Sequence, residues 1–236
     1  MEQRAIKGEL AHLYGDCRDP TKRSGVGCTK AKQSRVRERE GVGMARKGLK
    51  YEDIIMAAVA LVEEKGFSNF SLRELAGKLG VQPSSLYNHV GGIQELNMAV
   101  GLYGIEQMEH MLMSAIEGRS MAEALLAMAT AYRSFARSNP ELYEALIELR
   151  MNADPNMRAA LLRIVKPFFI VFRKEIQDES LVLHLQRSFR SMLHGMVALE
   201  NTGHMTCSDV DSEESFYFMV NQFIEMVKRG NFNGCQ

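Results

Sequence analysis

Six polar residues that can hydrogen-bond to nucleic acid lie close together in the first half of the chain. They are Gln82, Ser84, Ser85, Tyr87, Asn88 and His89. Their amide, hydroxyl and imidazole groups suit both base edges and phosphates in the major groove of DNA. No nucleophile with a base, carboxylate pair or glycine-rich phosphate loop occurs at a recognisable spacing. We therefore expect no catalytic residue, no cofactor and no metal site, and the chain is not predicted to be an enzyme.

The residues around this cluster have the spacing of a helix-turn-helix. Ser71 and Glu74 form a capping-box pattern that opens a helix, and Gly80 ends it. Ala76 is small where two helices must approach closely, and Gly80 supplies the left-handed backbone that the turn needs. A short helix over about residues 83–89 then presents the polar cluster. A purely structural helical hairpin is the competing interpretation, but a packing helix should not be this short, polar and bounded by glycines.

Helical patterns fill the rest of the chain from residue 50 onward. Apolar residues recur at helical spacing, and the starts are marked by Ser120, Asn139-Pro140, Asp154-Pro155 and Asp211. No stretch alternates with a period of two, so we predict an all-α fold. The expected helices cover about residues 51–65, 72–79, 83–89, 93–116, 120–137, 140–150, 155–176, 179–201 and 211–230.

Charge is distributed unevenly along the chain. The 29 basic and 29 acidic residues cancel, but residues 1–50 hold 13 basic and 6 acidic residues and therefore carry +7. A basic N-terminal part indicates an anionic partner. Residues 1–46 lack sustained apolar periodicity, so we expect a disordered extension there, and Met44 could be the native start. The four cysteines lie far apart, which favours reduced cytosolic thiols, and no apolar run is long enough to span a bilayer.

Both halves of the chain resemble TetR-family transcriptional regulators. The DNA-binding domain of that family is similar to residues 51–66, 70–81 and 85–90, where Leu-Tyr-Asn-His follows a Gly-Val turn. The second half resembles a subclass of the family's ligand domains, through residues 131–143 and a segment from His194-Gly195 to Glu200. The resemblance implies three parts, which are a basic extension at 1–46, a three-helix DNA-binding domain at 47–107, and a helical effector-binding and dimerisation domain at 108–230.

The resemblance assigns the polar cluster to double-stranded DNA. It makes base-edge candidates of Gln82, Ser84, Ser85 and Asn88, and phosphate contacts of Tyr87 and His89. Further contacts with the DNA backbone are implied for Lys50, Tyr51 and Arg73. Members of the family commonly have a lysine at the start of the next helix, where this chain has Gly91-Gly92. A bare helix N-terminus could still donate backbone N–H groups to a phosphate there.

The predicted DNA-binding segment is acidic. Residues 51–100 hold Lys65, Arg73 and Lys78 against six acidic residues, a net charge of −3. Neutralisation of phosphates supplies much of the affinity for DNA, so a further basic contribution is needed. We expect a basic arm along the DNA, formed by Arg35, Arg37, Arg39, Arg46 and Lys47. Deleting residues 1–43 should weaken DNA binding and flatten its salt dependence, whereas unchanged affinity would mean that the extension is inert.

The resemblance also implies an effector pocket and a homodimer. Pocket candidates are Tyr132, Phe135, Phe168, Phe172 and Met192, which indicate a small apolar or aromatic effector. We interpret His194 as a packing residue. The last two helices are expected to pair two subunits through Leu185, Phe189, Met196, Phe216, Val220, Phe223 and Ile224. Two recognition helices would then read a palindromic operator. The expected protein is a cytoplasmic bacterial repressor, associated with the nucleoid, that releases DNA when the effector binds.

Two other interpretations stay open. A helical dimeric adaptor or ligand-binding protein that has lost DNA binding would also fit the acidic segment and the missing lysine. A metal-carboxylate bundle needs two Glu-x-x-His pairs, and this sequence has one, Glu9 with His12. His204 with Cys207 is a further isolated pair, which is too few ligands for a site.

Overall fold

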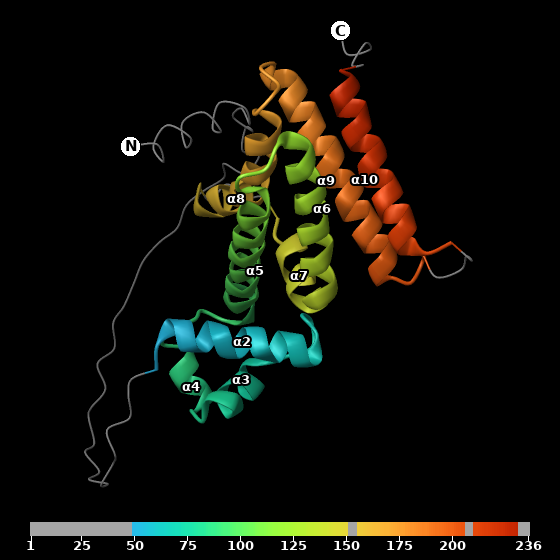
Figure 1. Ribbon diagram of the computed structural model, residues 1–236. Helices are drawn as coiled ribbons and strands as arrows, with labels where there is room; N and C mark the ends of the chain where they lie inside the picture. Colours follow the sequence, from blue (N-terminus) through green and yellow to red (C-terminus); the bar gives the residue numbers. More distant parts are fainter. Residues whose placement is uncertain (1–48, 151–154, 206–209, 231–236) are drawn as a thin grey trace, which may run out of the picture. The chain divides into compact units, whose positions relative to one another are not determined.

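The structure is a computed structural model that describes residues 49–150, 155–205 and 210–230. The chain divides into two units, residues 1–50 and residues 51–236. The described residues form nine helices and no strand (Figure 1), which confirms the all-α prediction. The helices are α2 (Tyr51–Lys65), α3 (Leu72–Leu79), α4 (Pro83–Leu86), α5 (Ile93–Ile116), α6 (Met121–Ser138), α7 (Pro140–Ile147), α8 (Pro155–Phe172), α9 (Glu179–Asn201) and α10 (Ser212–Arg229).

Several sequence-based expectations fall outside the described residues. They concern the extension and its arm at residues 1–46, the pair Glu9 and His12, the cap Asp154, and Cys207. In the part of the chain that the structure describes, no helix is long and apolar enough to cross a membrane.

The predicted caps explain where most helices begin. Ser71 opens α3 and Ser120 opens α6, each with a complete capping box in which a glutamate three residues on bonds back to the cap. Asp211 accepts a hydrogen bond from the Glu213 N–H at the start of α10. Each of these side chains satisfies backbone donors that the first helical turn leaves unpaired.

Three of the predicted helix ends are wrong. The short helix α4 ends at Leu86 rather than His89, because the next residues form turns, with the His89 N–H bonded to the Leu86 carbonyl at 2.9 Å. Helices α7 and α8 end at Ile147 and Phe172, before the predicted Arg150 and Ile176. Asn139 is the N-cap residue of α7 with Pro140 at its start, as predicted, but its side chain makes no capping bond there, because its amide donates back to the Phe135 carbonyl in α6 at 3.0 Å.

Helix α5 contacts α2, α6, α7 and α8, and two of its glycines set its distance from α7. A Cβ on Gly101 would lie 2.8 Å from the Ala145 carbonyl oxygen, and one on Gly104 would lie 3.1 Å from that of Leu142. Both glycines are therefore required for the close backbone approach of α5 to α7. At the start of α7, the Glu141 carboxylate accepts a hydrogen bond from the Phe67 N–H at 2.9 Å, which joins α7 to the loop after α2.

An aromatic cluster fills the interior between α8, α9 and α10. It consists of Phe168, Phe172, Phe189 and Phe223, whose neighbouring ring centroids lie 4.8–6.3 Å apart. These separations and the mostly edge-to-face angles are those at which aromatic rings attract one another. Figure 1 shows α9 and α10 side by side, and Phe172 of α8 contacts a ring of each of them, Phe189 and Phe223.

Candidate functional site

The capping box at Ser71 and the left-handed turn at Gly80, both predicted from the sequence, hold the helix-turn-helix together. The Ser71 hydroxyl accepts a hydrogen bond from the Glu74 N–H at 3.3 Å, and the Ser71 N–H donates to the Glu74 carboxylate at 2.9 Å. At the other end of α3, Gly80 has φ 66°, in the left-handed region, and the Val81 N–H bonds to the Ala76 carbonyl at 3.0 Å. This closure turns the chain sharply into α4.

The structure presents most of the predicted DNA-contacting side chains to solvent. Buried Leu86 and Val90 anchor the segment that contains α4. Exposed positions are Gln82, Ser84, Tyr87, Asn88 and His89, and Ser85 is half-buried. Tyr87 is 61% exposed, which is high for a large aromatic side chain without a partner to cover it. Gln82 makes no capping bond to α4, so its amide is available to a base edge.

Intramolecular ion pairs reduce the positive charge that this segment offers to DNA. The Lys65 ammonium lies 2.6 Å from the Glu74 carboxylate, and that of Lys78 lies 3.2 Å from Glu64. The Lys65 contact lowers the pKa of Glu74, which keeps that carboxylate ionised. Of the three cations in residues 51–100, Arg73 alone has no ion pair with a described residue. Arg73 and Lys50 are both exposed.

The N-terminus of α5 has no side-chain cap, but an acidic side chain is bonded right beside it. The Glu95 carboxylate accepts a hydrogen bond from the Gly91 N–H at 2.7 Å, just before Gly92, the N-cap residue of α5. An acidic side chain is favourable at a helix N-terminus, so it competes with a phosphate for that place. Burial and then the charge of Glu95 raise the pKa of Tyr51, another predicted backbone contact.

Replacing Glu95 with glutamine should therefore tighten DNA binding. The amide can still accept the Gly91 bond, but the negative charge next to an incoming phosphate is removed. We expect a roughly 2- to 10-fold gain in affinity at low salt, shrinking as salt screens the charge. Fluorescence anisotropy with labelled duplex DNA measures the change. Glu117→Gln, at the other end of α5, is the matched control, and an equal gain for both variants would contradict a local role of Glu95.

A buried chain of hydrogen bonds links three residues of the motifs in the second half. The hydroxyl groups of Tyr132 and Tyr143 lie 3.0 Å apart, and that of Tyr143 lies 2.6 Å from His194 Nδ1. Burial raises the pKa of both tyrosines, whereas burial and then Arg190 lower the pKa of His194. These shifts favour the neutral form of all three groups near pH 7. His194 is thus a hydrogen-bonded packing residue, as predicted.

An ion pair joins the same two motifs across the interior. The Arg133 guanidinium makes a two-pronged contact with the Glu200 carboxylate, at 2.6 Å from Nη2 and 3.0 Å from Nε, and each side chain is 6% exposed. Arg137 reaches the same carboxylate at 3.3 Å. The Arg133 guanidinium also lies 4.4 Å from the centre of the Phe216 ring, so this pair connects α6, α9 and α10.

The residues predicted to bind an effector lie in the packed interior. Tyr132, Phe135, Phe168 and Phe172 are buried, and Met192 is half-buried. None of these five residues lines the cavity of about 480 Å³ that the structure contains between α2, α5 and α8. Sequence reasoning missed this cavity. It assigned Tyr51 to the DNA backbone, and the helical spacing of the apolar lining residues did not separate them from core positions.

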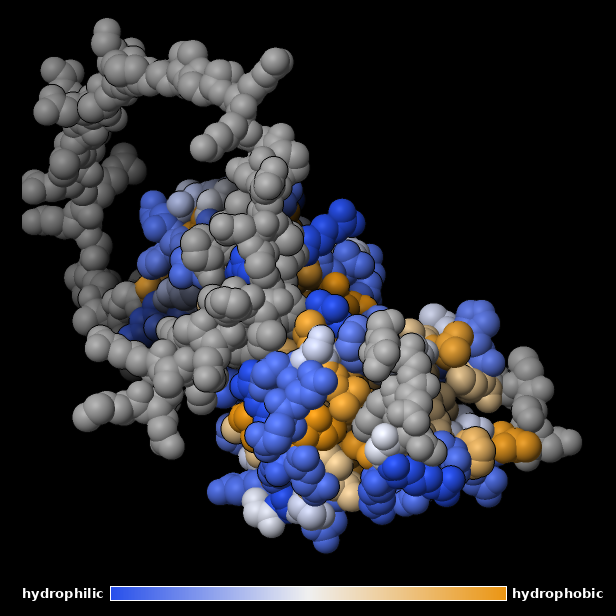
Figure 2. All heavy atoms as spheres, turned by 90° about the horizontal axis from the view of Figure 1, so that it is seen from above, coloured by the Kyte–Doolittle hydropathy of each residue, from blue (hydrophilic) through white to orange (hydrophobic). Residues whose placement is uncertain are grey.

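All seven residues predicted to form the dimer interface are buried within a single chain. Leu185, Phe189 and Met196 of α9, and Phe216, Val220, Phe223 and Ile224 of α10, face other helices of the same chain. Apolar spacing identified the inner faces of α9 and α10 rather than faces available to a partner. The large apolar side chains exposed on these helices are Leu199, Tyr217, Phe218 and Met226. On the face drawn in Figure 2, hydrophobic residues reach the surface among hydrophilic ones.

Comparisons with known proteins agree with both halves of this description. Residues 54–100 match the family model of bacterial regulatory proteins of the tetR family, and residues 125–223 match that of the tetracyclin repressor-like C-terminal domain. The uncharacterized HTH-type transcriptional regulator Rv0681 of Mycobacterium tuberculosis (strain ATCC 25618 / H37Rv) is 32% identical over 187 residues, which are 79% of this chain and 85% of the relative.

Solved structures share the fold at lower identity. A protein of unknown function from Rhodococcus sp. RHA1 is 19% identical with a TM-score of 0.67, over 77% of this chain and 96% of that one. AibR, in complex with isovaleryl coenzyme A and operator DNA, is 17% identical with a TM-score of 0.52, over 75% and 96%. The chain therefore belongs to the TetR family of transcriptional regulators, which bind DNA through a helix-turn-helix and are not enzymes.

Proposed function

We propose that this protein is a one-component repressor that binds a palindromic operator as a homodimer and releases it when a small apolar or aromatic effector binds. The observation that carries the DNA-binding part is the exposed polar cluster next to buried Leu86 and Val90. Base edges would be read by Gln82, Ser84, Ser85 and Asn88. Phosphate contacts would come from Lys50, Tyr51, Arg73, Tyr87 and His89.

The proposal also assigns separate roles to the two parts of the chain and includes control by an effector. DNA binding would lie in residues 47–107, and effector binding and dimerisation in residues 108–230, of the subclass with the His194-Gly195 motif. AibR was solved with both a ligand and operator DNA, which supports a ligand-controlled mechanism for a protein of the same fold. The effector can act only by binding the DNA-bound and released states with different affinity. Operator binding would place the protein at the bacterial nucleoid, in the cytoplasm.

Dimerisation would use the outer faces of α9 and α10. Leu199, Tyr217, Phe218 and Met226 expose apolar surface there, whereas the inner faces of both helices are already covered within the chain. Exposed large apolar side chains are candidates for protein–protein contacts. A homodimer would place two recognition helices about 34–36 Å apart, on successive turns of one DNA face.

Fluorescence anisotropy of the full chain with DNA from its own upstream region, at several salt concentrations, tests this function. Tight binding to a palindrome that resists competitor DNA, with a steep salt slope, is the expected result. Weak binding to every fragment would favour a helical dimeric adaptor. The ion pairs of Lys65 and Lys78 favour that alternative, because they leave residues 51–100 with little unpaired positive charge for DNA phosphates.

A further inference from the structure

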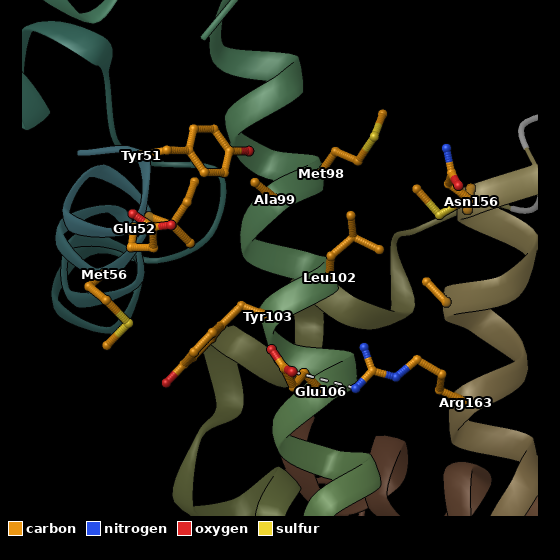
Figure 3. Close-up of a pocket in the computed structure, with 13 residues that line it drawn as sticks. Tyr51, Glu52, Met56, Met98, Ala99, Leu102, Tyr103, Glu106, Asn156 and Arg163 are labelled. Carbon is orange, nitrogen blue, oxygen red and sulfur yellow. Dashed lines mark ion pairs between the residues drawn. The ribbon is translucent and has the colours of Figure 1, made fainter. Parts of the chain in front are cut away.

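A cavity of about 480 Å³ opens between α2, the first helix of the DNA-binding region, and helices α5 and α8. Tyr51 and Met56 come from α2, Met98 and Tyr103 from α5, and Met157 from α8. Figure 3 shows the Tyr51 ring between α2 and α5, Tyr103 extending from α5 toward the side of α2, and Met98 and Leu102 extending toward α8. The volume suits a small organic molecule.

The lining is apolar, adaptable and unusually accessible. Three of its large apolar side chains reach solvent, with exposed fractions of 43% for Tyr51, 50% for Met56 and 38% for Met98. Methionine side chains bend to fit different shapes, and tyrosine rings attract cations over their faces. Such a gathering of exposed apolar groups around a hollow is typical of a ligand site.

The charges at the cavity are predominantly negative. Arg163 lies 3.5 Å from Glu106 and also contacts the Glu109 carboxylate, so one guanidinium serves two carboxylates. Figure 3 shows this Arg163 side chain directed from α8 toward Glu106 on α5. Glu52 on α2 also lines the cavity and has no ion pair with a described residue. Among the residues that line the cavity, the carboxylates of Glu52 and Glu106 stand against the one guanidinium of Arg163, which leaves a charge of −1. Arg163 also shares its charge with Glu109, which lies outside the lining.

We propose that this cavity binds a lipophilic organic cation, with its apolar groups against the methionines and tyrosines and its charge near Glu52 and Glu106. A neutral ligand would leave the excess negative charge uncompensated, and an anion would be repelled by it. The cavity is separate from the interior residues Tyr132, Phe135, Phe168 and Phe172. Its regulatory meaning rests on the proposed function: a cation bridging α2 to α5 and α8 would favour one orientation of the DNA-binding helices.

Two ions of the same shape and opposite charge test the site. Tetraphenylphosphonium and tetraphenylborate each carry four phenyl groups around one central atom. The full chain has 29 basic and 29 acidic residues, so its overall charge favours neither ion. Isothermal titration calorimetry with the full chain, in the absence of DNA, should give binding of the phosphonium at least about 10-fold tighter than that of the borate. Equal affinities for the two ions would overturn the proposal.

Variants locate the binding. Glu52→Gln with Glu106→Gln should weaken phosphonium binding about 10-fold or more. Ala160→Phe, which fills the cavity from α8, should weaken both ions, and Glu117→Gln is the matched charge control outside the cavity. Circular dichroism checks that each variant is folded. Phosphonium affinity that survives both the charge and the filling variants would refute the site.

A separate titration with operator DNA distinguishes failure of this site from failure of the proposed function. Phosphonium that binds in the cavity and releases the DNA supports both. Binding in the cavity without any effect on DNA, or with no DNA binding at all, upholds the cation site and contradicts the regulatory role. Release of DNA by phosphonium in the Ala160→Phe variant would instead place the effector elsewhere and count against the cavity.

Discussion

Replacing Glu200 with alanine should lower the free energy of unfolding by about 3–5 kcal/mol, the usual cost of leaving one member of a buried ion pair uncompensated. Arg133, 6% exposed, would lose its two-pronged partner and keep its charge against the Phe216 ring. Arg137 would lose the same carboxylate. The effect should be large because three helices meet at this pair.

Urea unfolding followed by circular dichroism measures the loss. Glu225→Ala is the matched control, because that glutamate pairs with Lys228 on the surface of α10 and its removal should have little effect. Arg133→Met combined with Glu200→Leu removes both charges and should recover most of the stability. If Glu200→Ala costs no more than Glu225→Ala, the pair does not stabilise the fold.

Replacing Gln82 and Asn88 with alanine should abolish selective DNA binding. A well-formed side-chain contact to a base is worth about 1–3 kcal/mol, so each substitution should weaken operator binding roughly 5- to 100-fold. Leu86 and Val90, which anchor the segment, are unchanged, so the fold should persist. Binding to unrelated duplex DNA should change little, because phosphate contacts remain.

Anisotropy with the operator and with a scrambled duplex of equal length separates the two effects. Gln222→Ala, which removes an exposed amide on α10, is the control and should behave like the unaltered chain. A double variant that loses affinity equally for both duplexes would show that Gln82 and Asn88 hold the backbone rather than read bases.

Local features of the fold could be predicted from the sequence, because their causes are local. The capping boxes at Ser71 and Ser120, and the left-handed Gly80, depend on residues within a few positions of one another. Glu95 was missed although its contact is also local. Its carboxylate accepts a hydrogen bond from the Gly91 N–H, and no common capping pattern predicts a bond at this spacing.

Contacts between distant residues could not be predicted in the same way. Tyr132, Tyr143 and His194 were all recognised within motifs, yet the sequence did not indicate that they hydrogen-bond to one another. The same holds for Arg133 and Glu200, which are 67 residues apart. Helical periodicity identifies an apolar face without saying which helix covers it, and for that reason the inner faces of α9 and α10 were assigned to a partner subunit.

The close approach of α5 to α7 also bears on how the DNA-binding helices are attached to the rest of the chain. At Gly101 and Gly104 the backbone of α5 packs against carbonyl oxygens of α7 and against the side chains of Leu142 and Leu149, so α7 resists a movement of α5 toward it by direct contact. Glu141 of α7 in turn accepts a hydrogen bond from the Phe67 N–H in the loop between α2 and α3. The DNA-binding helices are thus held at two points, directly by α5 and through α7.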